Sequence, residues 1–265
     1  MSVAAAPAGE EIARRERARL GGPAWWRYAG RHLVMPVIVV VAMVLLYLWV
    51  SSQKLDAIEL RTLNADFIRI RTLQTLQIAV YATAIALVIA VVLGVILTRP
   101  FARVLAPAAF GLANLGQATP AVGLLVLMTF IFGIGFKVAL IGLVVYSVLP
   151  ILRNTVVSIS QTDPALLEAA RGIGMNNAAI LFRVELPLAV PVILAGIRTA
   201  LVLNVGTAIL ATFVNAGGLG DIIVNGIALN RQPVLITGAA VTAALALTVD
   251  WVAGLIEEVL RPRGL

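Results

Sequence analysis

The sequence predicts an all-α fold, a polytopic bundle of about six helices that span a membrane. Two observations carry this prediction: the chain is unusually apolar, and its apolar residues fall into six long segments. Hydrophobic residues make up 61% of the 265 residues and charged residues 12%, whereas soluble domains contain about 45–50% apolar and about 25% charged residues. One soluble core of this length cannot hold so much apolar surface, so the bilayer is its natural place.

A helix needs roughly 20 mostly apolar residues to cross the hydrocarbon core, and six segments of the chain approach or exceed that length. The segments are residues 33–50, 76–97, 104–131, 138–152, 188–214 and 234–256. The third is overlong and contains Pro120, which removes a helix hydrogen bond, so we expect a kink or a break there. The fourth is short, at about 15 residues.

The chain divides into three parts around these spans. Residues 1–32 form a basic N-terminal segment that we place in the cytoplasm, and residues 33–75 comprise the first spanning helix and an outer loop. Residues 76–265 form the main transmembrane domain, with a long inner loop over residues 153–187. The polar lead is too long for a cleaved signal peptide, and the first apolar run is long enough to span. The moderately amphipathic stretch 55–74 is expected to lie along the outer interface.

The distribution of positive charge predicts the orientation. With the N-terminus in the cytoplasm, six spans return the C-terminus to the same side. The inner segments then carry thirteen basic residues, namely Arg14, Arg15, Arg17, Arg19, Arg27, Arg31, Arg99, Arg103, Arg153, Arg171, Arg183, Arg261 and Arg263. The outer segments carry six, namely Lys54, Arg61, Arg69, Arg71, Lys137 and Arg231. Cytoplasmic loops carry an excess of Lys and Arg, so both termini are predicted to be cytoplasmic.

Small residues recur every fourth position in two of the spans. They are Ala82, Ala86, Ala90 and Gly94 in the second, with a similar face of Gly196, Ala200, Asn204 and Ala208 in the fifth. Small residues let helix backbones approach closely in lipid, where no hydrophobic drive acts between helices. These faces favour a compact bundle, although alanine is abundant throughout the chain.

Several classes of function are excluded by what the sequence lacks. It has no cysteine and one histidine, His32. This composition excludes thiol chemistry, metal sites built from His or Cys, and Ser-His-Asp catalysis. No Gly-Lys dipeptide is present, so the chain cannot hold ATP through a P-loop. Gly218-Leu219-Gly220 is expected to be a turn before a short outer helix. The net charge of +7 fits cytoplasmic membrane loops, so we expect no nucleic-acid partner.

The inner loop contains a spaced motif. Asp163 and Pro164 form a good helix start, residues 165–171 are strong helix formers, and the glycines that follow permit a sharp turn. The motif itself is Glu168-Ala169-Ala170, then Gly174 after three residues, then Val184-Glu185-Leu186-Pro187 after nine more. The pattern predicts a helix–turn–helix that projects into the cytoplasm, where another protein could approach its small alanine faces.

This spacing resembles the EAA loop of binding-protein-dependent ABC importer permeases. The matching positions are Glu168, Ala169, Ala170, Gly174, Leu186 and Pro187, with Val184 where isoleucine is common. The resemblance extends from about residue 73 to the C-terminus. It implies a type I ABC importer permease fold in the bacterial cytoplasmic membrane, in which this loop docks on a separate ATPase subunit. It also implies that ATP and magnesium are bound by that ATPase, and that this chain has no catalytic site, cofactor or metal of its own.

Further blocks are similar to the osmoprotectant branch of that family. They are residues 117–121, 133–136, 146–155 and 216–223. The implied substrates are glycine betaine, carnitine, choline or proline betaine, delivered by an extracytoplasmic binding protein to a pore made of two permease chains. Amino-acid importers share parts of these blocks, so a permease for an amino acid or another small solute is the alternative.

Polar groups inside the spans are the candidates for the translocation path, because each costs free energy to place in lipid. They are Asn114, Gln117, Thr119, Pro120, Tyr146, Ser147, Asn204 and Thr207. The group around Pro120 stands out because broken helices at membrane depth are tolerated where they line a cavity. Hydrogen bonding between helices is the competing interpretation for each residue.

Two charged residues, Arg198 and Asp250, fall inside spans and could pair or reach the interface. An intramembrane enzyme would need paired carboxylates, a histidine–metal site or a serine dyad, and the sequence offers none. A carrier that works without ATP would need acidic groups in the membrane and internal repeats, and neither is apparent.

Overall fold

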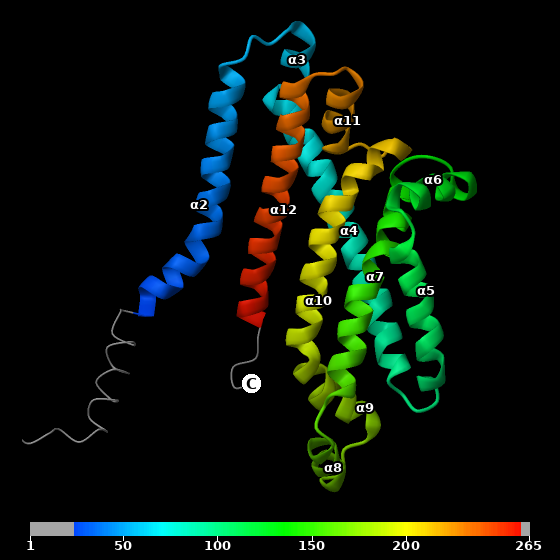
Figure 1. The fold of residues 1–265 in the computed structure, drawn as a ribbon. Coiled ribbons are helices and arrows are strands. Elements are labelled where there is room, and N and C mark those ends of the chain that lie inside the picture. The colour runs from blue at the N-terminus through cyan, green and yellow to red at the C-terminus, as the bar shows by residue number, and fades with distance from the viewer. Residues whose placement is uncertain (1–23, 261–265) are drawn as a thin grey trace, which may run out of the picture.

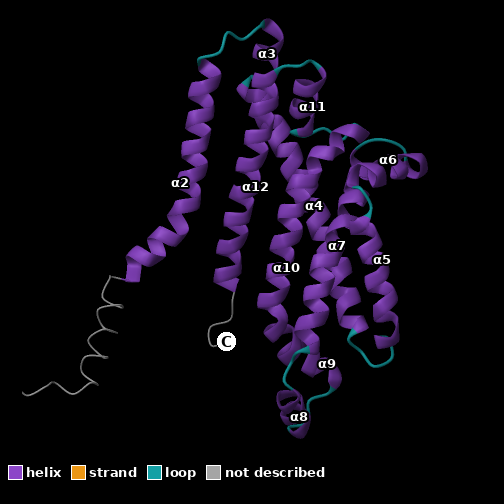
Figure 2. Ribbon diagram, viewed as in Figure 1, coloured by secondary structure: helices purple, strands orange, loops and turns teal. Residues whose placement is uncertain are grey.

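The computed structural model of the chain describes residues 24–260, which fold into helices with no strand in that range (Figure 2). Most of the N-terminal segment 1–32 therefore lies outside the described residues, as do residues 261–265. The elements in chain order are α2 (Ala24–Ser51), α3 (Ala57–Thr62), α4 (Ala65–Leu97), η1 (Arg103–Leu105), α5 (Ala106–Ala118), α6 (Ala121–Phe132), α7 (Phe136–Ser160), α8 (Pro164–Gly172), α9 (Asn177–Ile180), η2 (Leu181–Glu185), α10 (Leu186–Thr207), η3 (Ala208–Val214), α11 (Gly220–Ala228) and α12 (Gln232–Leu260).

Among the described residues, five helices are long and apolar enough to cross a membrane, and a bent pair makes a sixth span if it is counted as one. The bent pair is the third predicted segment. Its two parts, α5 with η1 before it and α6, meet at an angle of 103°. The kink or break expected at Pro120 is confirmed, and after it α6 turns away from the axis of α5 at the end of the bundle (Figure 1).

The outer loop is different from its prediction. Only α3 is a separate short helix, closed by a capping box in which Asp56 accepts from Glu59 N and the Glu59 side chain accepts from Asp56 N. Residues 65–74 are the first turns of α4, which starts at the N-cap Asn64. They continue the spanning helix rather than forming a separate segment, and Arg71 pairs with the Asp221 carboxylate of α11 at 2.8 Å.

The fourth span is longer than its apolar run. α7 continues to Ser160, so the inner loop begins near residue 161 rather than at residue 153. Thr155 is fully buried and donates its hydroxyl to the Ile151 carbonyl at 2.8 Å. Such local bonds let polar residues stay in a helix after the hydropathy has fallen. Close packing against α4 stabilises this end of α7. Thr155 lies so near Gly94 of α4 that a Cβ at position 94 would be 2.6 Å from Thr155 Cγ2.

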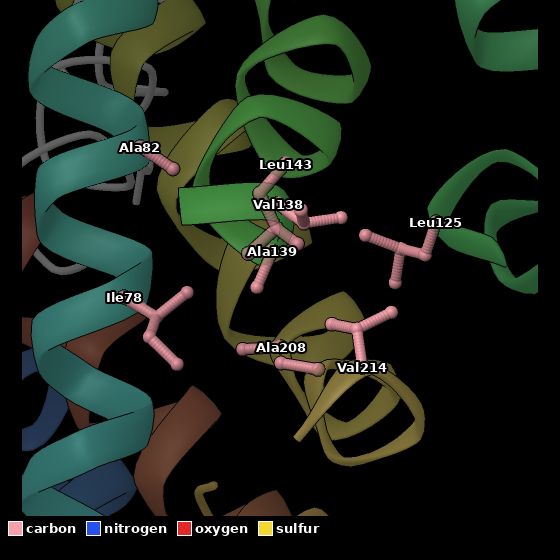
Figure 3. Close-up of a cluster of buried hydrophobic side chains, with 9 residues drawn as sticks. Ile78, Ala82, Leu125, Val138, Ala139, Leu143, Ala208 and Val214 are labelled. Atoms are coloured by element: carbon pink, nitrogen blue, oxygen red, sulfur yellow. The ribbon is translucent and has the colours of Figure 1, made fainter. Parts of the chain in front are cut away.

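The predicted small-residue faces do pack helix against helix. Ala82, Ala86 and Ala90 of α4 and Ala200 of α10 are fully buried. One cluster joins α4, α6, α7 and η3 through Ile78, Ala82, Leu125, Val138, Ala139, Leu143, Ala208, Ala211 and Val214 (Figure 3). α4 and α7 thus form the centre of the bundle, with α10 beside them.

The two ends of the bundle carry different elements. α8, α9 and the last described residues of α12 lie at one end, where α2 also begins, whereas α3, α6 and α11 lie at the other (Figure 1). This arrangement agrees with an even number of crossings. It leaves α8 as the most projecting element at its end.

Candidate translocation surface and coupling loop

The break between α5 and α6 is set by Thr119 and Pro120. Proline pushes the preceding residue out of the helical region, and Thr119 accordingly has an extended ψ of 133°. The carbonyl of Thr119 is thus turned out of the helix ladder, and it accepts a hydrogen bond from the Tyr146 hydroxyl at 3.1 Å. The break therefore presents a backbone acceptor to a polar side chain of α7.

A second proline frees another carbonyl beside it. Pro150 lies inside α7 and has no N–H, so the carbonyl of Tyr146 one turn earlier lacks its usual donor. Gln117 Nε2 donates to that carbonyl at 3.1 Å. Two hydrogen bonds therefore join α5 to α7 through Tyr146. A Cβ at Gly116 would lie 2.7 Å from Val145 Cγ1, which shows how closely the two helices approach.

Gln117, Tyr146 and Pro150 line an open cavity of about 480 Å³ on the face formed by α5, α7 and α10. Its lining residues are Gln117, Tyr146, Leu149, Pro150, Arg153, Asn154, Thr199 and Leu203. The cavity is large enough for a small solute, and it carries one guanidinium, two amides and two hydroxyls in an otherwise apolar wall. A hollow with a few convergent polar groups is typical of small-molecule sites.

Asn204 belongs to a different place. It is fully buried, and its Nδ2 donates to Thr83 Oγ1 on α4 at 2.9 Å. Its Oδ1 is buried without a hydrogen-bond partner. The side chain thus joins α10 to α4 inside the bundle and does not line the cavity.

The other predicted path residues lie outside the lining of this cavity. Thr207 shares a narrow crevice with Tyr146 and donates its hydroxyl to the Leu203 carbonyl of its own helix. Asn114 is exposed on α5, one turn before Gln117. Ser147 is fully buried and donates to the Leu143 carbonyl at 2.8 Å. The structure therefore brings Gln117, Thr119 and Tyr146 together directly, with Thr207 at the margin.

The inner loop forms the predicted helix–turn–helix. Asp163 caps α8 by accepting from Ala165 N at 2.9 Å, and Gly174 follows with a φ of +86°, which favours glycine. Ala170 is buried, whereas Glu168 and Ala169 are exposed. Three large apolar side chains at this end of the molecule are exposed: Leu166 by 49%, Ile173 by 80% and Phe182 by 68%.

The base of this loop is fixed to the bundle. Leu186 packs against the cluster of Ile159, Ala189 and Ile193, and Pro187 stands in the first turn of α10, where proline is tolerated. Glu185 is 6% exposed and forms an ion pair with Arg99 at the end of α4, at 2.5 Å. The base of the loop is therefore joined to both α4 and α10.

The opposite end carries a second fixed turn. Gly218 has a φ of +100°, and the following N–H of Leu219 donates to Thr75 Oγ1 at 2.8 Å. Asp221, in the first turn of α11, is held by Arg71. The expected turn before a short outer helix is confirmed.

The sequence matches the family described as binding-protein-dependent transport system inner membrane component over residues 90–262. The chain belongs to this family. The resemblance drawn from the inner loop is thereby confirmed, and the chain is a multi-pass inner-membrane permease subunit of an ABC importer.

Curated relatives of this permease are about 40% identical to it over the aligned residues. The carnitine transport permease protein OpuCD of Listeria monocytogenes is 42% identical over 69% of this chain and 81% of its own length. The glycine betaine/carnitine/choline transport system permease protein OpuCD of Bacillus subtilis is 40% identical over 69% of this chain and 80% of its own. The osmoprotectant import permease protein OsmW of Salmonella typhimurium is 38% identical over 80% of this chain and 100% of its own.

Solved structures confirm the predicted permease fold. An inward-facing MetNI methionine ABC transporter matches 73% of this chain and 96% of its own, with a TM-score of 0.64 and 24% identity. An amino acid ABC transporter solved with histidines matches 78% of this chain, with a TM-score of 0.63 and 18% identity.

Sequence reasoning did not assign Arg153, Asn154 and Thr199 to the cavity of the permease. A signal was present for one of them, because Tyr146, Pro150 and Asn154 recur every fourth residue and share a face of α7. Asn154 Nδ2 donates to the Val192 carbonyl of α10 at 2.9 Å, which ties the two walls together. The Arg99–Glu185 pair also escaped prediction, since its members are far apart in the sequence.

Proposed function

We propose that this permease carries an osmoprotectant of the glycine betaine, carnitine or choline type across the inner membrane. The observation that carries the proposal is an identity of 38–42% with three permeases named for such substrates. The cavity supports it, because its volume of about 480 Å³ leaves ample room for a small solute and water. Few of its lining groups are charged, which suits a site that releases its substrate rather than holding it.

The energy is supplied by a separate ATPase that docks on the inner loop. Exposed large apolar side chains outside the bilayer mark a protein-interaction surface, and Leu166, Ile173 and Phe182 supply one around α8. The coupling unit has two parts. The docking helix and its turn contain Glu168, Ala169, Ala170 and Gly174, and Leu186 and Pro187 anchor the loop to the bundle. ATP and magnesium are bound by the partner, and this chain contributes no cofactor or catalytic site.

A second permease chain completes the path. In a single chain, the polar cavity on α5, α7 and α10 would open to lipid, which is costly for amide and guanidinium groups. A second permease chain, either identical or a different permease subunit, faces this surface and makes it the wall of a shared pore. The end that carries α3 and α11 faces outward and receives substrate from an extracytoplasmic binding protein, and both termini are cytoplasmic.

Transport then follows alternating access. ATP binding closes the ATPase dimer and moves α8, and the base formed by Leu186 and the Arg99–Glu185 pair transmits this movement to α10 and α4. The two orientations of the pore are biased by which partner is bound.

The test is uptake of radiolabelled glycine betaine into vesicles that contain this chain with its neighbouring ATPase and binding protein. We expect uptake that requires ATP and stops when the ATPase is omitted. Competition by carnitine and choline, but not by methionine or histidine, distinguishes an osmoprotectant permease from an amino-acid permease. ATP-driven uptake of an amino acid without uptake of betaine would overturn the substrate proposal and keep the importer.

Substitution of Gln117 tests the path. In the Gln117→Leu variant, we expect betaine uptake to fall about fivefold, since a hydrogen bond worth about 1 kcal/mol is lost from the cavity wall. The matched variant Asn204→Leu should stay within about twofold of the parent, because it removes one interhelical bond and one unpaired buried oxygen together. Initial uptake rates, normalised to permease in the membrane, decide between them. Equal losses in both variants would contradict the assigned path.

A further inference from the structure

The described arginines of this permease differ in whether they have a carboxylate partner. Four half-buried arginines are each paired: Arg71 with Asp221 at 2.8 Å, Arg99 with Glu185 at 2.5 Å, Arg198 with Asp250 at 2.6 Å and Arg231 with Asp56 at 2.6 Å. The described arginines without a described carboxylate in ion-pair distance are Arg61, Arg103, Arg153, Arg171 and Arg183, and of these Arg153 is the one that lines the cavity, where its side chain is exposed. The cavity thus holds a guanidinium whose charge is available to a ligand.

The position of Arg153 on α7 places it on the same wall as Tyr146. The two residues are seven positions apart, which is about two turns and about 10 Å along the helix axis. Side chains of a helix lean toward its N-terminus, which is the direction of Tyr146 from Arg153, and both residues line the same cavity. Pro150 lies between them and Asn154 directly follows Arg153, and both residues are in the cavity wall.

The two groups have complementary preferences. A guanidinium binds a carboxylate with two parallel hydrogen bonds, and the face of a tyrosine ring attracts a quaternary ammonium group. A ligand that fits both carries a carboxylate at one end and a quaternary ammonium group at the other. Glycine betaine and carnitine have both groups, whereas choline has a hydroxyl in place of the carboxylate.

We propose that Arg153 is a specificity-determining residue of the translocation cavity, which binds the carboxylate of a zwitterionic substrate while the ring of Tyr146 meets its quaternary ammonium group. The inference rests on the proposed function and adds to it a preference within the substrate class. Carboxylated betaines are favoured over choline inside the permease itself, in addition to any selection by the binding protein.

The experiment measures this preference without the binding protein. Because the chain has no cysteine, Thr199→Cys supplies a single thiol in the cavity wall. The permease–ATPase complex is reconstituted in nanodiscs, and the rate of thiol labelling is measured in rising concentrations of glycine betaine or choline. We expect half-protection by glycine betaine at a concentration about tenfold lower than by choline, as for one charge-assisted hydrogen bond.

In the Arg153→Gln background, this difference should disappear, whereas Arg153→Lys should retain part of it because the charge remains without the planar fork. Arg103→Gln is the matched control. Arg103 is also an exposed arginine without a carboxylate partner among the described residues, but it is not part of the cavity lining. It should leave the tenfold difference unchanged. The basal labelling rate verifies that each variant retains its cavity.

ATP-driven betaine uptake by the parent complex is measured separately. If uptake is present but the protection ratio is the same with Arg153 and with glutamine, the role of Arg153 is refuted and the proposed function stands. Equal protection by the two ligands in the parent has the same meaning. If the parent complex takes up no betaine, the proposed function fails and this inference fails with it.

Discussion

Replacing Gly174 with valine should reduce ATP-driven uptake by at least about tenfold while leaving the permease in the membrane. Gly174 has a φ of +86°, a conformation that is a genuine outlier for a β-branched residue. Holding it there costs about 1–3 kcal/mol. No atom lies within 4 Å of a Cβ built at this position. The strain is therefore relieved by reorienting the exposed helix α8, and the transmembrane bundle is unaffected.

Gly172→Val is the matched control, because Gly172 also has open space around its Cβ but has no positive φ. Its uptake should stay close to that of the parent. ATP hydrolysis, uptake and the amount of copurified ATPase are measured for both variants. The expected result for Gly174→Val is hydrolysis without uptake, or loss of the ATPase from the complex. Full transport by Gly174→Val would show that the turn does not couple the two subunits.

Periodicity and composition could predict the membrane bundle but not the ends of its helices. Each apolar run marks where a helix lies in lipid, whereas the helix itself ends where its backbone hydrogen bonds end. α7 continues past its apolar run, where Thr155 is buried against Gly94, and α4 begins before its run at the N-cap Asn64, with Arg71 then paired to Asp221. The contacts of Thr155 and Arg71 join distant segments, and hydropathy contains no information on such contacts.

The helix–turn–helix of the inner loop could be predicted because it is local. Its cap at Asp163 and its turn at Gly174 depend only on residue type and spacing. The cavity is not local, since it combines three helices. The sequence could identify Gln117 and Tyr146 as polar groups in spans, but it could not separate them from Asn204, which is equally polar and faces Thr83 instead.

Among the proposed variants of this permease, Asp250→Leu should lose the most stability. Arg198 Nε and Nη2 donate to the two carboxylate oxygens of Asp250 at 2.6 and 2.7 Å, which joins α10 to α12. Glu257 is farther away, at 3.5 Å, and Gly254 makes room for the guanidinium. Loss of Asp250 leaves Arg198 poorly compensated within the span. Such a change costs about 3 kcal/mol when the pair is buried, and somewhat less here because both side chains are about one third exposed.

The double variant Arg198→Met/Asp250→Leu should recover most of that stability, because apolar residues of similar volume can replace an ion pair with little loss. The melting temperature of each purified variant is measured, and the cycle of two single variants and the double variant gives the coupling energy. A coupling above about 1 kcal/mol would establish that the pair acts as one unit between α10 and α12. Additive losses would contradict it. They would mean instead that each charge reaches the membrane interface by itself and that α10 and α12 are held together by their apolar contacts alone.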